Sequence, residues 1–163
     1  MTTRNPSWLA RAIVIAVAAI VGISSGSHGV IRDATVMAAT AAQTSEAKRS
    51  VRSGVYTDEQ AMRGKAEYKR CLLCHLDTGA GDPNSGIPPL VGEEFLKTWN
   101  TLTLKELFER ISTTMPQDNP GGMSTKQYVD VTSYILQMNK FPAGKEELPT
   151  DTAQFDRIVI EKP

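Results

Sequence analysis

The spacing of apolar residues in the second half of the chain has the period of an α-helix. Apolar side chains at i, i+3, i+4 and i+7 form one stripe at Leu104, Leu107, Phe108 and Ile111. A second stripe with helical spacing runs through Tyr128, Val131, Ile135 and Met138. Each stripe predicts an amphipathic helix that buries one face in a common core.

Three short sequences of the form Ser/Thr-x-x-Glu/Gln mark the expected helix starts, at Thr57–Gln60, Thr103–Glu106 and Ser124–Gln127. In such a capping box, the first hydroxyl and the fourth side chain each satisfy a free backbone N–H of the first helical turn. The first box predicts a helix that continues to about Arg70. Asn139 and Pro142 mark the end of the last helix.

Between these helices the chain is rich in glycine and proline, which favour long loops over 78–89 and 116–122. A short helix is expected over Glu93 to Thr98. The β-like run from Arg157 to Ile160 predicts either a short terminal strand or an extended arm. The predicted fold class is therefore all-α, with three main helices, a short one and long Gly/Pro-rich loops.

The N-terminus has the features of an export signal. Arg4 and Arg11 flank an apolar run from Ala12 to Ile23, and small residues follow it. The run is shorter than the roughly 20 residues that span a bilayer. This favours a cleaved signal peptide over 1–27, with a retained membrane anchor as the alternative. Export predicts a periplasmic protein, either soluble or anchored at its N-terminus.

The rest of the chain divides by composition into three parts. Residues 28–55 are rich in Ala, Ser and Thr without a sustained period, which predicts a flexible linker. The helical pattern occupies 56–142, and 143–163 is expected to be an extended C-terminal tail. The 18 basic and 18 acidic residues balance each other, so nothing in the charge favours a nucleic-acid partner.

The motif that carries chemistry is Cys71-Leu72-Leu73-Cys74-His75. Cys-x-x-Cys-His is the attachment signal of a c-type haem. The two thiols, one helical turn apart, would add to the two vinyl groups, and the adjacent imidazole would ligate the iron. A haem would also supply the apolar core that short helices and long loops lack.

Three other interpretations of the two cysteines are weaker. A thioredoxin-like dithiol goes with a βαβ pattern, which the sequence lacks. A structural zinc site needs four ligands, whereas the chain has two cysteines and two histidines, and His28 lies in the N-terminal segment. A disulfide between Cys71 and Cys74 would close a very small loop and constrain the unfolded chain little.

The second axial ligand is expected to be a methionine, because His75 is the only histidine after the N-terminal segment. The candidates after that segment are Met62, Met115, Met123 and Met138. Those on the first and last helices are better explained as core residues. Met123 is explained as an apolar contact just before the last helix, so Met115 is favoured as the iron ligand. A His/Met pair raises the potential and fills both axial positions, which favours electron transfer.

Over roughly Tyr56 to Phe141 the chain resembles the class I c-type cytochromes. The matching residues are Gly64, Tyr68, Cys71–His75, Pro88–Gly92, Met115–Pro116 and Tyr134. The resemblance implies a cytochrome c fold wrapped around one covalently bound haem c, in which Gly64 lets the first helix cross the last one closely. It also implies that the Pro88 carbonyl accepts a hydrogen bond from His75. Trp99 would donate to a haem propionate, with simple packing as the alternative.

Two further stretches, Asn119–Ser124 and Tyr134–Gly144, are similar to the small cytochromes associated with bacterial quinoprotein alcohol dehydrogenases. This resemblance implies a periplasmic electron-transfer protein that is not itself an enzyme, although it could be a subunit of an oxidoreductase complex. A dehydrogenase, such as a quinoprotein, would be the electron donor, and a terminal oxidase or another cytochrome the acceptor. The alternative is a haem enzyme or gas-binding sensor with a displaceable sixth ligand.

Overall fold

The computed structural model describes residues 48–162, so the predicted signal and most of the predicted linker lie outside the described residues. The described chain is mostly helical, which confirms the all-α class. Its α-helices are α1 (Asp58–Glu67), α2 (Leu72–His75), α3 (Gly92–Trp99), α4 (Leu104–Thr114) and α5 (Thr125–Met138). The 3-10 turns and strands are η1 (Val51–Ser53), η2 (Tyr68–Arg70), η3 (Pro83–Ser85), η4 (Thr152–Arg157), β1 (Arg49–Ser50) and β2 (Ile158–Val159). No helix within 48–162 has the length and apolar character needed to cross a membrane.

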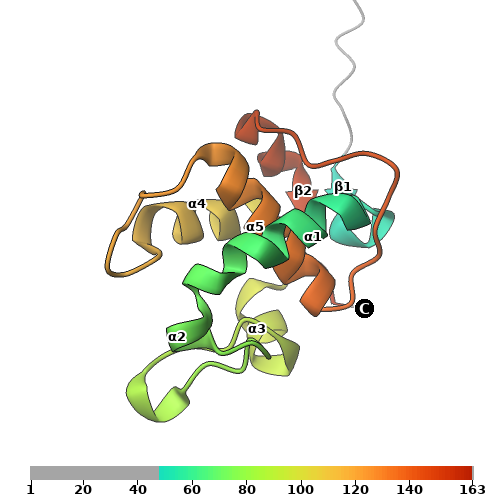
Figure 1. The fold of residues 1–163 in the computed structure, drawn as a ribbon. Helices are drawn as coiled ribbons and strands as arrows, with labels where there is room; N and C mark the ends of the chain where they lie inside the picture. Colours follow the sequence, from blue (N-terminus) through green and yellow to red (C-terminus); the bar gives the residue numbers. More distant parts are fainter. Residues whose placement is uncertain (1–47, 163) are drawn as a thin grey trace, which may run out of the picture. The chain divides into compact units, whose positions relative to one another are not determined.

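The crossing of α1 and α5 lies at the centre of this unit (Figure 1). Gly64 of α1 lies against the backbone of α5, where a Cβ atom would overlap the Asp130 carbonyl oxygen and come within 2.9 Å of the Tyr134 Cβ. The rings of Tyr68 and Tyr134 meet edge to face, with their centroids 5.2 Å apart. The two helices therefore approach closely at Gly64, as the resemblance implies.

Two of the three predicted capping boxes form in full. Thr103 with Glu106 and Ser124 with Gln127 exchange both hydrogen bonds at the starts of α4 and α5. These local contacts define where the two longest helices begin. At the start of α1 the hydroxyl of residue 57 accepts the N–H of residue 60 as predicted, but the side chain of residue 60 points elsewhere.

That side chain, Gln60, binds the C-terminal segment instead. Its Nε2 donates to the Leu148 carbonyl at 3.0 Å, and its Oε1 accepts the Leu148 N–H at 2.8 Å. Both residues are only 2% exposed. The prediction of a complete box at Thr57 is wrong, because the buried backbone of residue 148 offers the amide a donor and an acceptor at once.

The C-terminal segment is folded, where the sequence predicts an extended tail over 143–163. Leu148, Phe155 and Ile160 are buried, with at most 2% of each exposed. Phe155 packs edge to face on Phe108 of α4, with ring centroids 5.5 Å apart. Beyond it, β2 pairs in parallel with β1, so the short terminal strand is confirmed and the extended tail is wrong. The anchoring apolar residues are spaced too widely to produce a periodic signal.

The folded unit also begins earlier than Tyr56, where the sequence analysis places its start. Val51 and Val55 are 0% and 3% exposed, and β1 lies inside the range 28–55 that was predicted to be a flexible linker. β1 is ordered because β2, near the other end of the chain, satisfies its backbone groups. The linker prediction is therefore wrong for residues 49–55.

The predicted apolar stripe of α4 faces the core, with buried or partly buried side chains at Leu104, Leu107, Phe108 and Ile111. Met138 of α5 also packs against this core, as predicted. Met62 does not, because its side chain is 65% exposed. α1 turns Ala61 and Gly64 toward α5 and leaves Met62 on its outer face, so the prediction that Met62 is a core residue is wrong.

Candidate functional site

The Cys-x-x-Cys-His motif forms a single helical turn, α2, directly after η2. The Cys71 carbonyl accepts the N–H groups of Cys74 at 3.2 Å and His75 at 2.8 Å. Both cysteines are free thiols and are partly buried. The turn ends at Leu76, which has a φ of 61°, and whose carbonyl accepts the Tyr68 hydroxyl at 3.1 Å. The motif is thereby tied to the crossing of α1 and α5, where Tyr68 packs.

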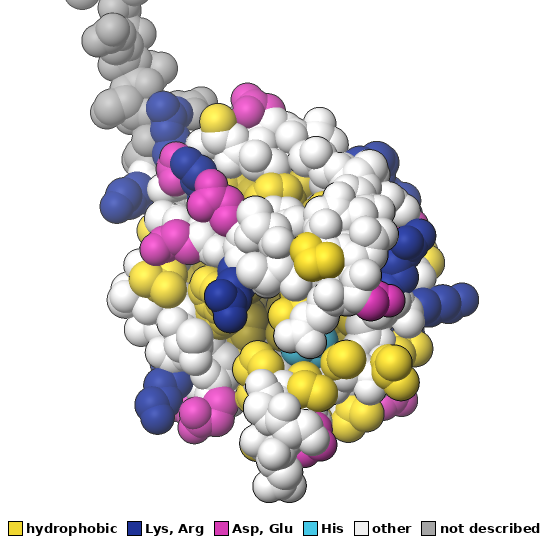
Figure 2. All heavy atoms as spheres, turned by 90° about the vertical axis from the view of Figure 1, so that its left-hand side faces the viewer, with side chains coloured by type: hydrophobic (Ala, Val, Ile, Leu, Met, Phe, Trp, Pro, Cys, Tyr) yellow, Lys and Arg dark blue, Asp and Glu magenta, His cyan; other side chains and the backbone are white. Residues whose placement is uncertain are grey.

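The motif lines a cavity of about 380 Å³ between α2, α4 and α5. Apolar side chains from three regions form most of its wall: Ile87, Pro88 and Leu90 before α3, Ile111 from α4, and Val131 and Ile135 from α5. Figure 2 shows a hollow on this side of the molecule, with hydrophobic side chains gathered around it and histidine atoms inside. A concave, mostly apolar cavity of this size suits an organic cofactor.

Five of the six predicted site residues line this cavity, namely Cys71, Cys74, His75, Pro88 and Met115. They come from three separate segments of the chain: the motif, the loop before α3, and the end of α4. Trp99, the sixth, is not among the lining residues. Its ring lies near Phe95 within α3, with the two centroids 6.3 Å apart, and packs against the core.

His75 is held in one orientation and one tautomer. Its side chain is only 6% exposed, and its Nδ1 lies 3.1 Å from the Pro88 carbonyl oxygen. A carbonyl can only accept a hydrogen bond, so Nδ1 carries the proton and Nε2 keeps a free lone pair. Burial lowers the pKa of His75, and the bond to Pro88 offsets this only in part. Burial therefore favours the neutral ring, whose Nε2 can serve as a metal ligand.

Met115 lies at the point where α4 ends. Its N–H still donates to the Ile111 carbonyl at 3.0 Å, but its φ of −125° and ψ of 151° are extended. Its carbonyl accepts the hydroxyl of Tyr128 from α5 at 2.7 Å. Met123, the alternative ligand, is buried in the core and does not line the cavity. Of the two candidates, the structure brings Met115 to the cysteines and the histidine.

The Cys71 thiol is not set up as a reactive nucleophile. Burial, followed by the neighbouring Cys74, raises the pKa of Cys71 to about 11. Catalytic cysteines depend on a lowered pKa, because the thiolate is the attacking species. The surroundings of Cys71 therefore favour the protonated thiol at neutral pH.

Asn139, which the sequence predicts only as a helix end, supports this site from outside the cavity. Its Nδ2 donates to the Leu90 carbonyl at 2.8 Å, and its Oδ1 accepts the Gly92 N–H at 3.1 Å. The side chain, 7% exposed, thus clamps the loop that carries Pro88 onto the end of α5. An asparagine at a helix end is the only local sign of this role in the sequence. The backbone groups of Leu90 and Gly92 that it bonds lie almost fifty residues away.

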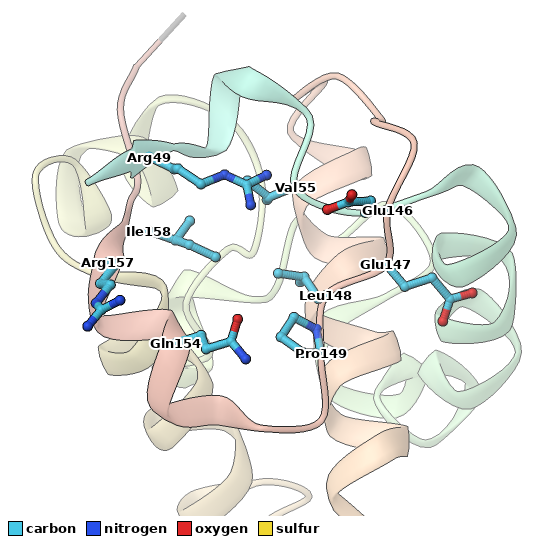
Figure 3. Close-up of a pocket in the computed structure, with 9 residues that line it drawn as sticks. All are labelled: Arg49, Val55, Glu146, Glu147, Leu148, Pro149, Gln154, Arg157 and Ile158. Carbon is cyan, nitrogen blue, oxygen red and sulfur yellow. The ribbon is translucent and has the colours of Figure 1, made fainter. Parts of the chain in front are cut away.

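A second cavity, of about 440 Å³, lies on the side of the C-terminal segment (Figure 3). Arg49, Gln154 and Arg157 line it together with apolar residues that include Val55 and Leu148. None of its lining residues belongs to the cluster of cysteine, histidine and methionine. Within residues 48–162, no group of three or more His, Cys, Asp and Glu side chains is arranged to hold a metal ion.

Comparison with known proteins adds no relative: the chain matches no family model, and neither a curated protein nor a solved structure shows significant similarity to it.

Proposed function

We propose that this chain is a class I c-type cytochrome that transfers electrons through one covalently bound haem c. The observation that carries the proposal is the convergence of four groups on one apolar cavity. These are two free thiols, an imidazole whose Nε2 is free, and the thioether-bearing residue Met115. None of the other interpretations of the two cysteines, as a redox dithiol, a zinc site or a disulfide, uses all four groups at once.

The residues present fit a haem. Cys71 and Cys74 stand one helical turn apart on the cavity wall, as attachment to two vinyl groups requires. Much of the remaining wall is aliphatic, which suits a porphyrin face, and Arg70, Ser85, Gln117 and Asp118 add polar groups to it. When bound there, the haem iron would supply one-electron redox chemistry.

The protein groups then have separate tasks. Cys71 and Cys74 anchor the macrocycle, and His75 provides the nitrogen ligand through Nε2. The Pro88 carbonyl fixes the imidazole orientation and raises its basicity by accepting the Nδ1 proton in a hydrogen bond at 3.1 Å. Met115 would provide the soft sulfur ligand from the end of α4. An iron held by two protein ligands would have no open position for a substrate, which favours electron transfer over catalysis.

The crossing of α1 and α5 at Gly64 supports a cytochrome c fold for residues 56–142. In the proposed fold the three main helices and the loop before α3 wrap the haem. The packed segments at 49–55 and 143–162 are additions outside the part of the chain that carries the resemblance.

We place the protein in the periplasm, exported by the segment 1–27 and membrane-bound only if that segment is retained. Its partners are a donor dehydrogenase, such as a quinoprotein, and an acceptor such as a terminal oxidase or another cytochrome. Exposed apolar side chains beside the cavity support docking of such partners: Leu72, Leu73 and Leu76 are 38%, 94% and 46% exposed. Nothing in the balanced charge favours nucleic acid.

The optical spectrum of the oxidised holoprotein tests this proposal. A Met–iron charge-transfer band and no binding of carbon monoxide by the reduced form are expected for a closed His/Met site. Met115→Ala should abolish the band, whereas Met123→Ala is the matched control and should keep it. A wild-type protein that lacks the band and binds carbon monoxide readily would instead be a haem enzyme or gas sensor with a displaceable sixth ligand.

A further inference from the structure

We infer that Tyr128 is a positioning residue for the sulfur ligand: its hydroxyl holds the Met115 carbonyl and so keeps the Met115 side chain at the cavity. This inference rests on the proposed function, because it concerns Met115 as the residue that would supply sulfur to the haem iron. The sequence predicts Tyr128 only as a member of the apolar stripe of α5, which assigns no role to its hydroxyl.

The contact joins the end of α4 to the start of α5. Tyr128 lies in the first helical turn of α5 and is 3% exposed, and its Oη lies 2.7 Å from the Met115 carbonyl oxygen. The Met115 N–H is bonded to Ile111 in α4. The peptide groups on both sides of the Met115 Cα are therefore fixed, one by α4 and the other by α5.

Fixation matters at this position because Met115 is where the backbone leaves helical geometry. The residues that follow, Pro116 to Asp118, line the same cavity and belong to a loop that continues to the Ser124 cap. α5 also contributes Val131 and Ile135 to the cavity wall. A bond from Tyr128 therefore sets the position of Met115 relative to the wall against which the haem would lie.

A thioether is a neutral and weak ligand, so small changes in its positioning change how readily it is displaced. Losing one buried neutral hydrogen bond should shift the equilibrium between bound and displaced Met115 by roughly 3- to 10-fold. If Tyr128 only filled space, replacing it with phenylalanine would not produce this shift, because phenylalanine fills nearly the same volume.

The test compares Tyr128→Phe with Tyr56→Phe in the oxidised holoprotein. Tyr56 is a matched control, since its buried hydroxyl also donates to a backbone carbonyl, that of Phe141 at 2.6 Å, but Phe141, unlike Met115, does not line the cavity. Imidazole is added to each protein, and displacement of Met115 is followed by loss of the Met–iron charge-transfer band. Thermal unfolding is measured in parallel to compare the general loss of stability.

For Tyr128→Phe, the imidazole concentration that displaces half of the Met115 ligand should fall roughly 3- to 10-fold below the wild-type value. Tyr56→Phe should keep the wild-type value even where it unfolds as easily as Tyr128→Phe. The inference is overturned if Tyr128→Phe matches the wild type, or if both variants shift alike. A wild-type protein without the band would instead overturn the proposed His/Met ligation, so the two failures are distinguishable.

Discussion

Replacing Gln60 with alanine tests whether the C-terminal segment is an integral part of the fold. The Gln60 amide is the only side chain described as bonding the Leu148 backbone within residues 48–162, and it bonds both the N–H and the C=O. Both residues are 2% exposed. Gln60→Ala therefore leaves a buried donor and a buried acceptor without their partners, and removes a buried contact between α1 and the segment, while the surface ion pair of Arg63 with Glu147 stays.

The size of the effect follows from these two stranded groups. Each buried polar group left unpaired costs roughly 1–3 kcal/mol, so two such groups set a range of roughly 2–6 kcal/mol. The space left by the amide would admit water, which partly satisfies them. We therefore expect the free energy of unfolding to fall by about 3 kcal/mol.

Gln127→Ala is the matched control, because Gln127 occupies the same N3 position at the start of α5. Its amide completes an ordinary capping box with Ser124 at the surface, so its loss should cost about 0.5–1 kcal/mol. Guanidinium unfolding of the holoproteins measures both changes. If Gln60→Ala lowered the free energy of unfolding no more than Gln127→Ala does, the segment after residue 142 would not be anchored through Gln60.

Three further changes probe other contacts. Gly64→Ala should lower the free energy of unfolding by about 3 kcal/mol, because the new Cβ meets the backbone of α5, which cannot rotate away as a side chain can. Guanidinium unfolding measures this change, and an unchanged midpoint would contradict the close crossing. Asn139→Ala should speed hydrogen exchange in the loop after Pro88 and leave α1 unchanged; equal acceleration in both would refute a local clamp. Hydrogen bonds from Thr103 lower the pKa of Glu106 in the folded protein. The Glu106 carboxylate therefore adds to the free energy of unfolding above the usual glutamate pKa. This contribution is lost as the pH falls through the lowered pKa. The stability advantage over Glu106→Gln should therefore shrink on acidification, and an advantage that grew would reverse this sign.

The elements that the sequence predicts well are those defined by neighbouring residues. The boxes at Thr103 and Ser124 join atoms three residues apart, and the α4 stripe repeats every turn, so local physics decides both. The box at Thr57 fails in its second half, since a backbone 88 residues away competes for Gln60. The strand at Arg49 is missed for the same reason, because its partner lies near the opposite end of the chain.

The same difference between neighbouring and distant contacts decides which residues of the candidate site the sequence predicts. Cys71, Cys74 and His75 are contiguous, so one motif identifies them, and Met115 follows from comparing the few methionines with their helices. The hydroxyl of Tyr128 and the amide of Asn139 were not predicted to act there. Their partners are backbone groups 13 and up to 49 residues distant, and backbone groups carry no sequence signal.

Covalent attachment of one haem through Cys71 and Cys74 is the claim on which the other proposals depend. The most direct test is the intact mass of the protein, produced in a bacterial periplasm together with the haem-attachment machinery and then extracted with acidified acetone. The account predicts the mass of the polypeptide plus one haem, with colour that stays in the protein fraction. The double variant Cys71→Ala/Cys74→Ala should lose its haem to the solvent. A wild-type chain with the mass of the polypeptide alone, or one whose haem is extracted as readily as that of the double variant, would contradict the account.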